Sequence, residues 1–405
     1  MTKSMTLAEE LQWRGFTNQT TFDDISDVNQ PRTFYLGVDP TASSMHIGNL
    51  AAVMLVRHLV AGGHKAIVLV GGATGMIGDP KEDEERVLKS LDEIEKNKNG
   101  IAAQYKMLLE GEAFDLVDNY DWFKDIGFLQ FLREVGKNFS MTQLLDREFI
   151  KARIGEGNIG ISYAEFSYGL IQGYDFLHLY REKGATLQIG GSDQWGNMLS
   201  GAQMIKKLDG GEAHVWTVPL ILDKSTGKKF GKSEGNAIWL DDQMTSPYKF
   251  YQFWLNVGDE SVGDYLRIFT HITPDDHAQL MTDLQANPGR RDAQKYLAYE
   301  VTKLVHGIDR AEASRNVTAA LFGDTPFSEL LETELDMLAG EIPTTASSHV
   351  INALVTSGVA VSNSEAKRLI EGGAISVNGE KISEDVQLAT PALIKKGKNS
   401  FILAR

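Results

Sequence analysis

The chain has 405 residues, of which 42% are hydrophobic and 23% charged, and it contains no cysteine. Its length exceeds the ~250 to 300 residues at which a single core stops growing, so we expect two or three domains. The absence of cysteine excludes disulfides, thiolate catalysis and cysteine-ligated zinc. No apolar run approaches the ~18 to 20 residues that span a bilayer, and the first residues lack the apolar core of a signal peptide. We therefore expect a soluble, cytoplasmic protein with no membrane association and no structural metal.

The formal net charge of −15 argues against a protein that coats nucleic acid non-specifically. The charge is unevenly distributed, because residues 347–405 contain seven Lys and Arg against five Asp and Glu. This segment carries a net charge of +2, so a local basic face is expected there.

The first part of the chain has the pattern of a parallel α/β sheet. Residues 33–38 read as a strand, 49–61 as a helix with an apolar stripe, and 66–70 as a continuously apolar, buried strand. Two later strands, 186–189 and the one from Val215, end in polar turns. Parallel sheets are covered on both faces and bind ligands at the carboxyl ends of their strands. The predicted fold class is α/β, with a Rossmann-like catalytic domain over residues 1–222.

The rest of the chain divides into four further segments. A lysine-rich loop, 223–244, precedes a predicted α-helical domain, 245–323, whose apolar residues recur with helical periodicity. An acidic, Pro-bounded stretch, 324–346, follows and reads as a linker. Residues 347–405 predict a small α+β module with two short helices and a hairpin that turns at Asn378-Gly379.

Two separated motifs indicate nucleotide chemistry. In the first, residues 39–49, His46 and Asn49 are three residues apart at the start of a helix, so both side chains can lie beside free N–H groups. Phosphates bind at helix N-termini, and donors placed where charge develops accelerate displacement at phosphorus. For His46 alone, a capped helix is the simpler interpretation. Asp39 before it and the lysine loop later favour a nucleotide site.

The second motif, residues 228–233, places Lys229, Lys232 and Ser233 in a Gly-containing loop suited to a leaving pyrophosphate. A solvated basic turn is the commoner meaning of such a run. A P-loop is excluded by spacing, because the position five residues before Gly231 is Thr226 rather than glycine.

Residues 155–160 match a dinucleotide-binding pattern, with Asp175 about twenty residues further on. That pattern should follow a buried strand, whereas residues 151–154 are basic and poorly apolar. We interpret the segment as a flexible loop, with a dehydrogenase as the alternative.

Taken together with both motifs, six further stretches resemble the bacterial tyrosyl-tRNA synthetases, which are class I aminoacyl-tRNA synthetases. These stretches are residues 35–41, 71–80, 163–168, 172–175, 188–197 and 245–254. The resemblance covers about 35–322, and residues 347–405 resemble the S4-type RNA-binding domain of that family.

The resemblance implies a role for each matching residue. The substrate tyrosine would contact Tyr35, Asp79, Tyr168, Gln172, Asp175 and Gln194. ATP, brought with Mg²⁺, would contact Gly37, Asp39, Thr41, His46, Gly48, Asn49, Gly191, Asp193 and Lys232. The catalytic residues would be His46, Asn49, Lys229, Lys232 and Ser233.

Three departures from the family pattern stand out. The second histidine of the first motif is Asn49 here, which keeps a donor, and a frequent cysteine is Leu36, which removes a polar contact. The stretch after Pro80 is shorter and more acidic than expected, which leaves Lys81 and Arg86 as candidates for the tRNA acceptor arm. In the C-terminal module, Lys367 and Arg368 are the candidate RNA contacts.

The implied activity is ATP-dependent attachment of L-tyrosine to tRNA(Tyr) by a homodimer. A tryptophanyl enzyme of the same class is the nearest rival, although Asp175 facing Tyr35 would be the wrong pocket for tryptophan. The alternative from a different functional class is an RNA-binding protein that keeps the synthetase fold without using it for catalysis.

Overall fold

The computed structural model describes residues 5–80, 84–145, 148–154, 160–221, 232–233, 236–323 and 325–405. The chain forms two compact units, one of residues 1–244 with 257–293 and one of 245–256 with 294–405. The helical segment expected at 245–323 is therefore divided between the two units. In the described part of the chain, no helix combines the length and the apolar character needed to cross a membrane.

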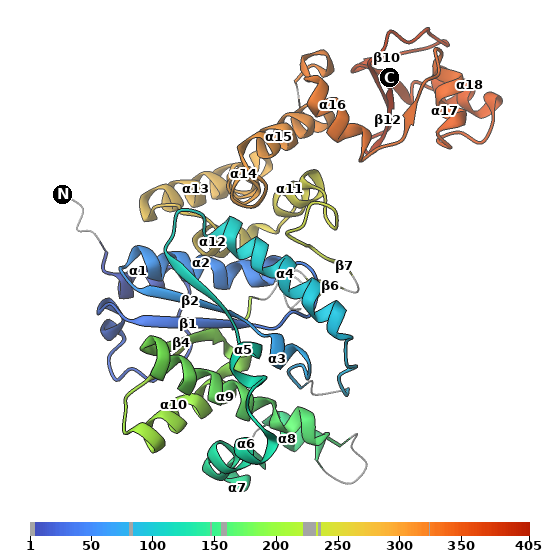
Figure 1. Cartoon of the computed structure of the whole chain (residues 1–405). Coiled ribbons are helices and arrows are strands. Elements are labelled where there is room, and N and C mark those ends of the chain that lie inside the picture. The colour runs from blue at the N-terminus through green and yellow to red at the C-terminus, as the bar shows by residue number, and fades with distance from the viewer. Residues whose placement is uncertain are drawn as a thin grey trace. The chain divides into compact units, whose positions relative to one another are not determined.

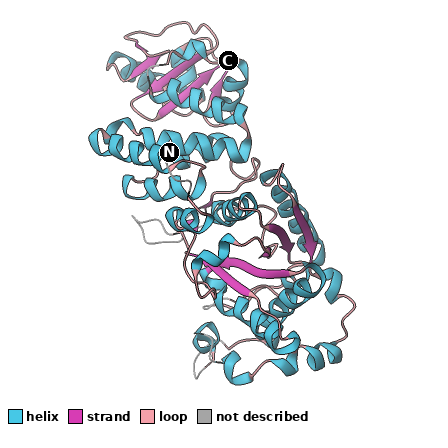
Figure 2. Ribbon diagram, turned by 90° about the vertical axis from the view of Figure 1, so that its left-hand side faces the viewer, coloured by secondary structure: helices cyan, strands magenta, loops and turns pink. Residues whose placement is uncertain are grey.

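A five-stranded parallel sheet forms the centre of the first unit, in the order β3-β2-β1-β4-β5, which confirms the predicted Rossmann-like architecture (Figure 1). The strands are β1 (Thr33–Val38), β2 (Lys65–Val70), β3 (Phe114–Asp118), β4 (Ala185–Gly191) and β5 (His214–Val218). Helices flank this sheet (Figure 2), as parallel sheets with crossover connections require. The longer connecting helices are α2 (Ile47–Ala61), α4 (Leu91–Leu108), α9 (Tyr163–Lys183) and α10 (Trp195–Asp209).

The remaining described elements of the first unit are short or lie after β5. They are α1 (Leu7–Arg14), η1 (Ile25–Asn29), α3 (Gly72–Gly75), α5 (Tyr120–Phe123), α6 (Phe128–Glu134), η2 (Gly136–Asn138), α7 (Met141–Leu145), α8 (Glu148–Arg153), η3 (Ser192–Gln194), β6 (Lys232–Ser233), β7 (Asn236–Ala237), α12 (Asp259–Phe269), α13 (Pro274–Ala286) and η4 (Pro288–Arg290).

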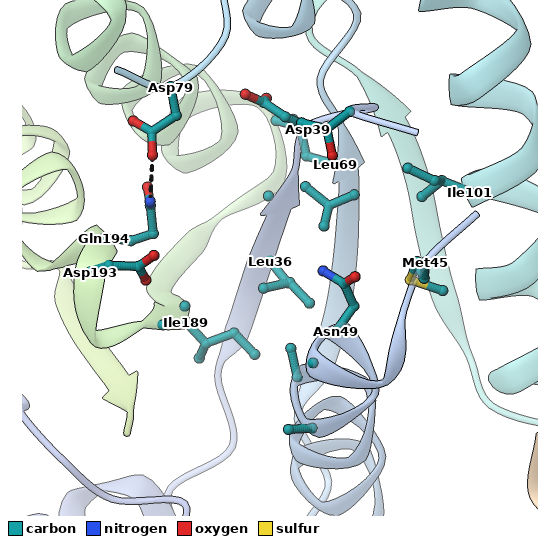
Figure 3. Close-up of a pocket in the computed structure, with 18 of the residues that line it drawn as sticks. Leu36, Asp39, Met45, Asn49, Leu69, Asp79, Ile101, Ile189, Asp193 and Gln194 are labelled. Carbon is teal, nitrogen blue, oxygen red and sulfur yellow. Dashed lines mark hydrogen bonds between the residues drawn. The ribbon is translucent and has the colours of Figure 1, made fainter. Parts of the chain in front are cut away.

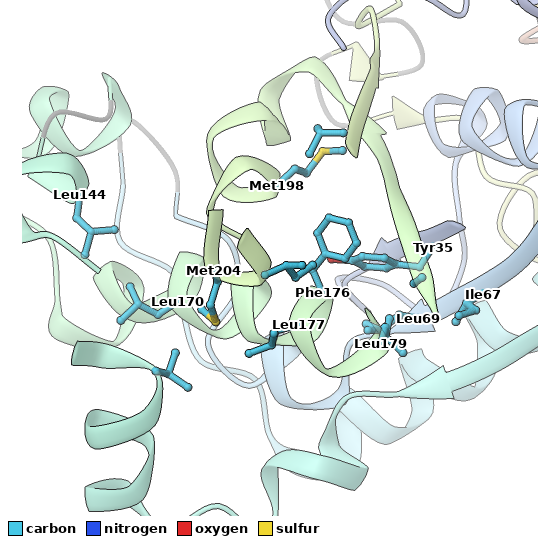
Figure 4. Packing of buried hydrophobic residues seen from close by; sticks show 14 residues of the cluster. Tyr35, Ile67, Leu69, Leu144, Leu170, Phe176, Leu177, Leu179, Met198 and Met204 are labelled. Atoms are coloured by element: carbon cyan, nitrogen blue, oxygen red, sulfur yellow. The ribbon is translucent and has the colours of Figure 1, made fainter. Parts of the chain in front are cut away.

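The core beneath the carboxyl edge of the sheet joins β1 to α9 and α10. Tyr35 of β1 and Phe176 of α9 are both buried, with ring centroids 5.2 Å apart (Figure 4). Gly201 of α10 allows close approach, because a Cβ there would lie 2.6 Å from that of Phe176. This packing fixes α9 against the strand that carries Tyr35.

The second unit contains a helical part and a small mixed sheet of order β10-β9-β11-β12-β8. Its elements are α11 (Pro247–Leu255), most of α14 (Asp292–His306), α15 (Ile308–Phe322), η5 (Phe327–Glu329), α16 (Glu332–Ala339), β8 (Thr344–Thr345), α17 (Val350–Thr356), α18 (Asn363–Glu371), β9 (Ile375–Val377), β10 (Glu380–Lys381), β11 (Ala392–Lys396) and β12 (Ser400–Ala404). The predicted hairpin joins β9 to β10, and its two turn residues have φ of 50° and 88°, the left-handed values of a type I′ turn.

Most of the segment expected to be a linker, 324–346, is folded. It contains η5, α16 and β8, and Leu335 and Leu338 of α16 are buried in a cluster with Leu321 and Leu403. β8 also adds a parallel edge strand to β12. The helical part and the small sheet of this unit therefore share a hydrophobic core.

Candidate functional site

A cavity of about 620 Å³ opens at the carboxyl end of β1 and β4 and at the N-terminus of α2 (Figure 3). Such an edge is where doubly wound α/β proteins bind ligands. The cavity brings together residues predicted from four separate stretches of sequence: Tyr35, Gly37, Asp39, Thr41, His46, Gly48, Asn49, Asp79, Arg86, Tyr168, Gln172, Asp175, Gly191, Asp193 and Gln194. Leu36 lies in its wall as well.

The other predicted site residues are placed differently. Lys81 and Lys229 lie outside the described residues, as do the side chains of Lys232 and Ser233, whose backbone forms β6 against β7. Lys367 and Arg368 lie on α18 in the second unit, where both are exposed.

His46 is the N-cap of α2. Its Nδ1 accepts a hydrogen bond from the Gly48 N–H at 3.0 Å, and Asn49 Oδ1 accepts one from the His46 N–H at 3.1 Å. Because Nδ1 is an acceptor, the ring proton of neutral His46 lies on Nε2. The capped helix considered as the simpler interpretation is thus present, and it stands at the mouth of the cavity with its N-terminal dipole.

Asp79 is held by two amides at the cavity. Its Oδ2 accepts from Gln194 Nε2 at 2.8 Å (Figure 3), and its Oδ1 accepts from Asn197 Nδ2 at 3.3 Å. Burial raises the pKa of Asp79 to about 6, against the opposing hydrogen bond from Gln194. The two amide hydrogen bonds therefore do not fully offset the cost of burying the negative charge of Asp79.

Asp39 accepts a hydrogen bond from the Tyr168 hydroxyl, at 2.9 Å between Oη and Oδ2. Burial raises the pKa of Asp39, while hydrogen bonds from Thr74 and Tyr168 oppose the shift. Tyr168, expected beside a substrate ammonium, is thereby joined to a residue expected beside ATP, so the two predicted subsites share a hydrogen bond.

Asp175 is only 2% exposed and accepts two hydrogen bonds. Asn119 Nδ2 donates at 3.1 Å and Trp122 Nε1 at 2.9 Å. Burial raises the pKa of Asp175 well above its usual range, and the pKa of Tyr35 is likewise raised by burial and then by the charge of Asp175. Among the described residues, the buried Tyr35 hydroxyl finds no hydrogen-bond partner. A ligand hydroxyl at this end of the cavity would supply one.

Asn119 and Trp122 are hydrogen-bond partners of Asp175 that the sequence analysis does not predict. They follow β3, a strand whose apolar run is interrupted by Asp115, and that strand was not recognised. Had it been, the general rule that ligands lie beyond the carboxyl ends of parallel strands would have pointed to residues 118–122.

Arg86, expected at the tRNA acceptor arm, lies in the wall of the cavity. Its Nε donates to the Asp79 carbonyl at 2.6 Å, and its backbone N–H donates to the carboxylate of Glu165 at 3.2 Å. Glu165 in turn pairs with Arg153 at 3.1 Å, and both side chains are buried. Burial raises the pKa values of Asp39 and Asp79, and the positive charge of the Arg86 guanidinium opposes both shifts in part.

The chemistry of the cavity suits a ligand with both an ammonium and a hydroxyl group. Four carboxylates and several amides line one space, and the N-terminus of α2 adds an end that attracts anions. Within the described ranges, no cluster of three or more His, Asp or Glu side chains has the arrangement of a metal site.

Residues 27–323 match the family model of the class I tRNA synthetases (W and Y), and residues 334–404 match the tyrosine–tRNA ligase SYY-like C-terminal domain. The chain is 41% identical over 423 residues to tyrosine–tRNA ligase 2 of Bacillus cereus, covering 99% of both proteins. It is 42% identical over 423 residues to the tyrosine–tRNA ligase of Bifidobacterium longum, covering 98% of this chain and 96% of that protein. The chain belongs to the tyrosyl-tRNA synthetases.

Solved structures agree with membership of the tyrosyl-tRNA synthetases. A C-terminally truncated mitochondrial tyrosyl-tRNA synthetase of Aspergillus nidulans matches with a TM-score of 0.68 and 29% identity, over 77% of this chain and 93% of that one. A tryptophanyl-tRNA synthetase of Encephalitozoon cuniculi matches with a TM-score of 0.56 and 13% identity, over 82% of this chain and 91% of that one. The second likeness shows a shared fold only.

The raised pKa of Asp79 predicts a pH-dependent stability for the variant Asp79→Asn. A carboxyl with a raised folded-state pKa stabilises the protein below its unfolded-state pKa, and this contribution is lost as the pH rises through about 6. Asp79→Asn removes that loss, so the ligand-free variant should exceed the wild type in free energy of unfolding at pH 8, by about 1–2 kcal/mol. The advantage should shrink steadily between pH 6 and pH 4.

Urea unfolding of both proteins at several pH values measures this difference. A difference in free energy of unfolding that does not change between pH 8 and pH 4 would show that Asp79 does not carry the burial cost described above.

Proposed function

We propose that the protein activates L-tyrosine with ATP, forming tyrosyl-adenylate and pyrophosphate, and then transfers the tyrosyl group to the 3′-terminal adenosine of tRNA(Tyr). Family membership supports the reaction, since the relatives named above are tyrosine–tRNA ligases that align over almost their full length. The observation that carries the choice of substrate is the polar end of the cavity, where the Tyr35 hydroxyl and the Asp175 carboxylate face one buried space.

The phenol hydroxyl of the substrate is proposed to bind between Tyr35 and Asp175. Phenylalanine would leave these buried polar groups without a partner, and the cost of that loss is the physical basis of discrimination. A preference of about 10⁵ for tyrosine over phenylalanine, without editing, is already established for this enzyme class. Tryptophan has a larger ring with a single N–H donor and no hydroxyl, so it can offer a hydrogen bond to Asp175 or to Tyr35 but not to both.

The ammonium of tyrosine is proposed to bind Asp79, Tyr168 and Gln172, with Gln194 beside them. The raised pKa of Asp79 supports its place in this set, because its hydrogen bonds do not fully offset the cost of burying its charge. A bound ammonium would stabilise that charge. Gln172 lines the same cavity, and its buried Oε1 has no hydrogen-bond partner among the described residues. That acceptor suits an N–H donor.

ATP is proposed to lie along the first motif and the end of β4. The proposed contacts are Gly37, Asp39, Thr41, His46, Gly48, Asn49, Gly191, Asp193 and Lys232. The N-terminus of α2 supports a phosphate position, because the positive end of the helix dipole attracts anions there. The N–H groups of Ile47, Gly48 and Asn49 are hydrogen-bonded within the chain, so the dipole rather than free donors provides this attraction. Gly191 leaves room for the Asp193 carboxylate at the end of β4, since a Cβ there would lie 2.5 Å from Asp193 Oδ1. Leu36 provides an apolar wall where a polar contact is frequent in the family.

In the proposed first step, the tyrosine carboxylate attacks the α-phosphorus of ATP and pyrophosphate leaves. His46 and Asn49, with Lys229, Lys232 and Ser233, would stabilise the charge that develops on the phosphates. Mg²⁺ would enter with ATP as part of that substrate. The tRNA hydroxyl then attacks the acyl carbon and AMP leaves, so no covalent bond to the enzyme forms. Positioning and electrostatics carry both steps.

Pyrophosphate exchange tests the first step and its substrate. Incorporation of labelled pyrophosphate into ATP should depend on tyrosine, with phenylalanine and tryptophan giving background rates. Lys232→Ala should lower the rate by about 10²–10³-fold, as expected when one stabilising donor is lost. Exchange driven by tryptophan would assign the tryptophanyl activity, and folded protein inactive with every amino acid would favour the RNA-binding alternative.

The second unit is proposed to bind tRNA through α18, where Lys367 and Arg368 are exposed. Removing residues 347–405 would be a poor test, because Leu393 and Phe401 from this segment share a hydrophobic cluster with Val317. The double variant Lys367→Glu/Arg368→Glu leaves that core intact.

Charge reversal at Lys367 and Arg368 should lower kcat/KM for tRNA by at least about tenfold, because two phosphate contacts are replaced by repulsion. Tyrosine-dependent exchange serves as the internal control and should be unchanged. Equal loss of both activities would contradict a separate RNA-binding role, and unchanged tRNA charging would exclude α18 from the interface.

A homodimer is proposed from exposed apolar side chains in the first unit. Phe128 and Leu129 of α6 are 64% and 78% exposed, and Met141, Leu145 and Ile154 nearby in sequence are also exposed. Large apolar side chains exposed in this way favour an interface with another protein chain. Light scattering should give twice the chain mass of 44.7 kDa, and Leu129→Asp should shift the mass toward one chain. A wild-type mass of one chain at micromolar concentration would contradict the proposal.

A further inference from the structure

Asp175 is connected to the aromatic surface of α9 through Trp122. The Trp122 indole donates from Nε1 to Asp175 Oδ1 at 2.9 Å. Its ring also lies nearly parallel to the imidazole of His178, with centroids 4.4 Å apart and an interplanar angle of 20°. One indole therefore contacts a pocket carboxylate at its edge and a histidine ring at its face.

Trp122 belongs to an element that cannot orient it alone. The helix α5 has four residues, Tyr120–Phe123, none of them buried and with no side-chain cap at Asn119. A single turn of helix has little stability of its own. The direction of the Trp122 N–H therefore depends on what packs against the indole.

His178 supplies a fixed surface for that packing. It lies on α9, a helix of 21 residues in which Asp175, Phe176 and Leu177 are buried. His178 follows Asp175 by three residues, so both project from the same side of α9. The stack thus locks the indole to the helix that carries its hydrogen-bond acceptor.

We propose that His178 is a positioning residue for tyrosine binding: its ring holds Trp122 so that the indole N–H stays directed at Asp175. The proposal rests on the proposed function, which places the substrate hydroxyl at Asp175. An indole N–H bound to Oδ1 fixes the carboxylate rotamer, leaving the carboxylate oriented toward the hydroxyl. Loss of the stack frees the indole, so that of the two donors only Asn119 still holds the carboxylate, which is then less firmly oriented.

His178 acts through its shape rather than its charge near neutral pH. Burial lowers its pKa, and the charge of Glu182 opposes that shift only in part. A neutral aromatic ring of similar size should therefore replace it. Offset-stacked aromatic pairs contribute about 0.5–1.5 kcal/mol, which corresponds to a factor of about 2 to 12 in binding.

The test compares His178→Ala with His178→Phe in steady-state pyrophosphate exchange. The alanine variant should raise KM for tyrosine about three- to tenfold, with KM for ATP unchanged. It should also weaken discrimination against phenylalanine. The phenylalanine variant keeps a stacking ring and should restore KM for tyrosine to within about twofold of wild type.

His214→Ala is the matched control. His214 stacks on Phe22 in the same unit, with centroids 4.3 Å apart and an interplanar angle of 28°, and neither residue lines the cavity. The His214→Ala variant removes a stack of the same kind as His178→Ala does. It should lower the melting temperature to a similar extent as His178→Ala, while KM for tyrosine stays at the wild-type value.

A second readout does not need activity. The indole N–H resonance of Trp122, identified by its loss in Trp122→Phe, should exchange faster with solvent in His178→Ala and recover in His178→Phe. The inference is overturned if KM for tyrosine and this exchange rate are unchanged in His178→Ala, or if His178→Phe behaves like His178→Ala. Wild-type protein without tyrosine-dependent exchange would instead overturn the proposed function, while the resonance would still test the positioning.

Discussion

Asp39, Asp79 and Asp175 share one cavity, and burial raises the pKa of all three. Moving a carboxylate out of water costs free energy that neutral hydrogen-bond donors offset only in part. The donors around these groups are mostly a phenol, amides and an indole, with the guanidinium of Arg86 as a positive charge beside two of them. A substrate that brings an ammonium and a hydroxyl lowers the free-energy cost of burying these carboxylates. Ligand binding is therefore favoured by the same burial that raises their pKa values.

The sheet makes this arrangement possible because its strands are parallel. β1, β2 and β4 deliver their carboxyl ends to one edge, and each is followed by a turn that carries polar side chains. α2 begins at that edge with His46 as its cap, so the positive end of a helix faces the same space as the carboxylates. Opposite electrostatic environments within one cavity suit a reaction between an amino acid and a polyphosphate.

Sequence patterns predicted the centre of the fold well. β1 coincides with the strand expected at residues 33–38, because a continuously apolar run between turns has few other interpretations. The sequence pattern does not predict β3, because Asp115 interrupts its apolar run. Asn119 and Trp122, which follow this strand, are therefore not predicted as site residues either. The expected linker is folded because Leu335 and Leu338, weak as a sequence signal, meet apolar partners distant in sequence. Arg86 was a candidate tRNA contact because it is basic and follows Pro80, a position that does not show the direction of its side chain. Residues gathered in the cavity were proposed from family motifs, which encode three-dimensional proximity that local periodicity does not.

The most direct test of the account is the number of protons released when tyrosine binds, measured by titration calorimetry in buffers of different ionisation enthalpy. In the free protein the pKa of Asp79 is raised to about 6, so the group is largely protonated at pH 5.5. An incoming ammonium favours the ionised form, and binding at pH 5.5 should therefore release protons, in an amount that decreases in Asp79→Asn. Tyrosine binding with no proton release at pH 5.5 would contradict the claim that the substrate compensates this buried carboxylate.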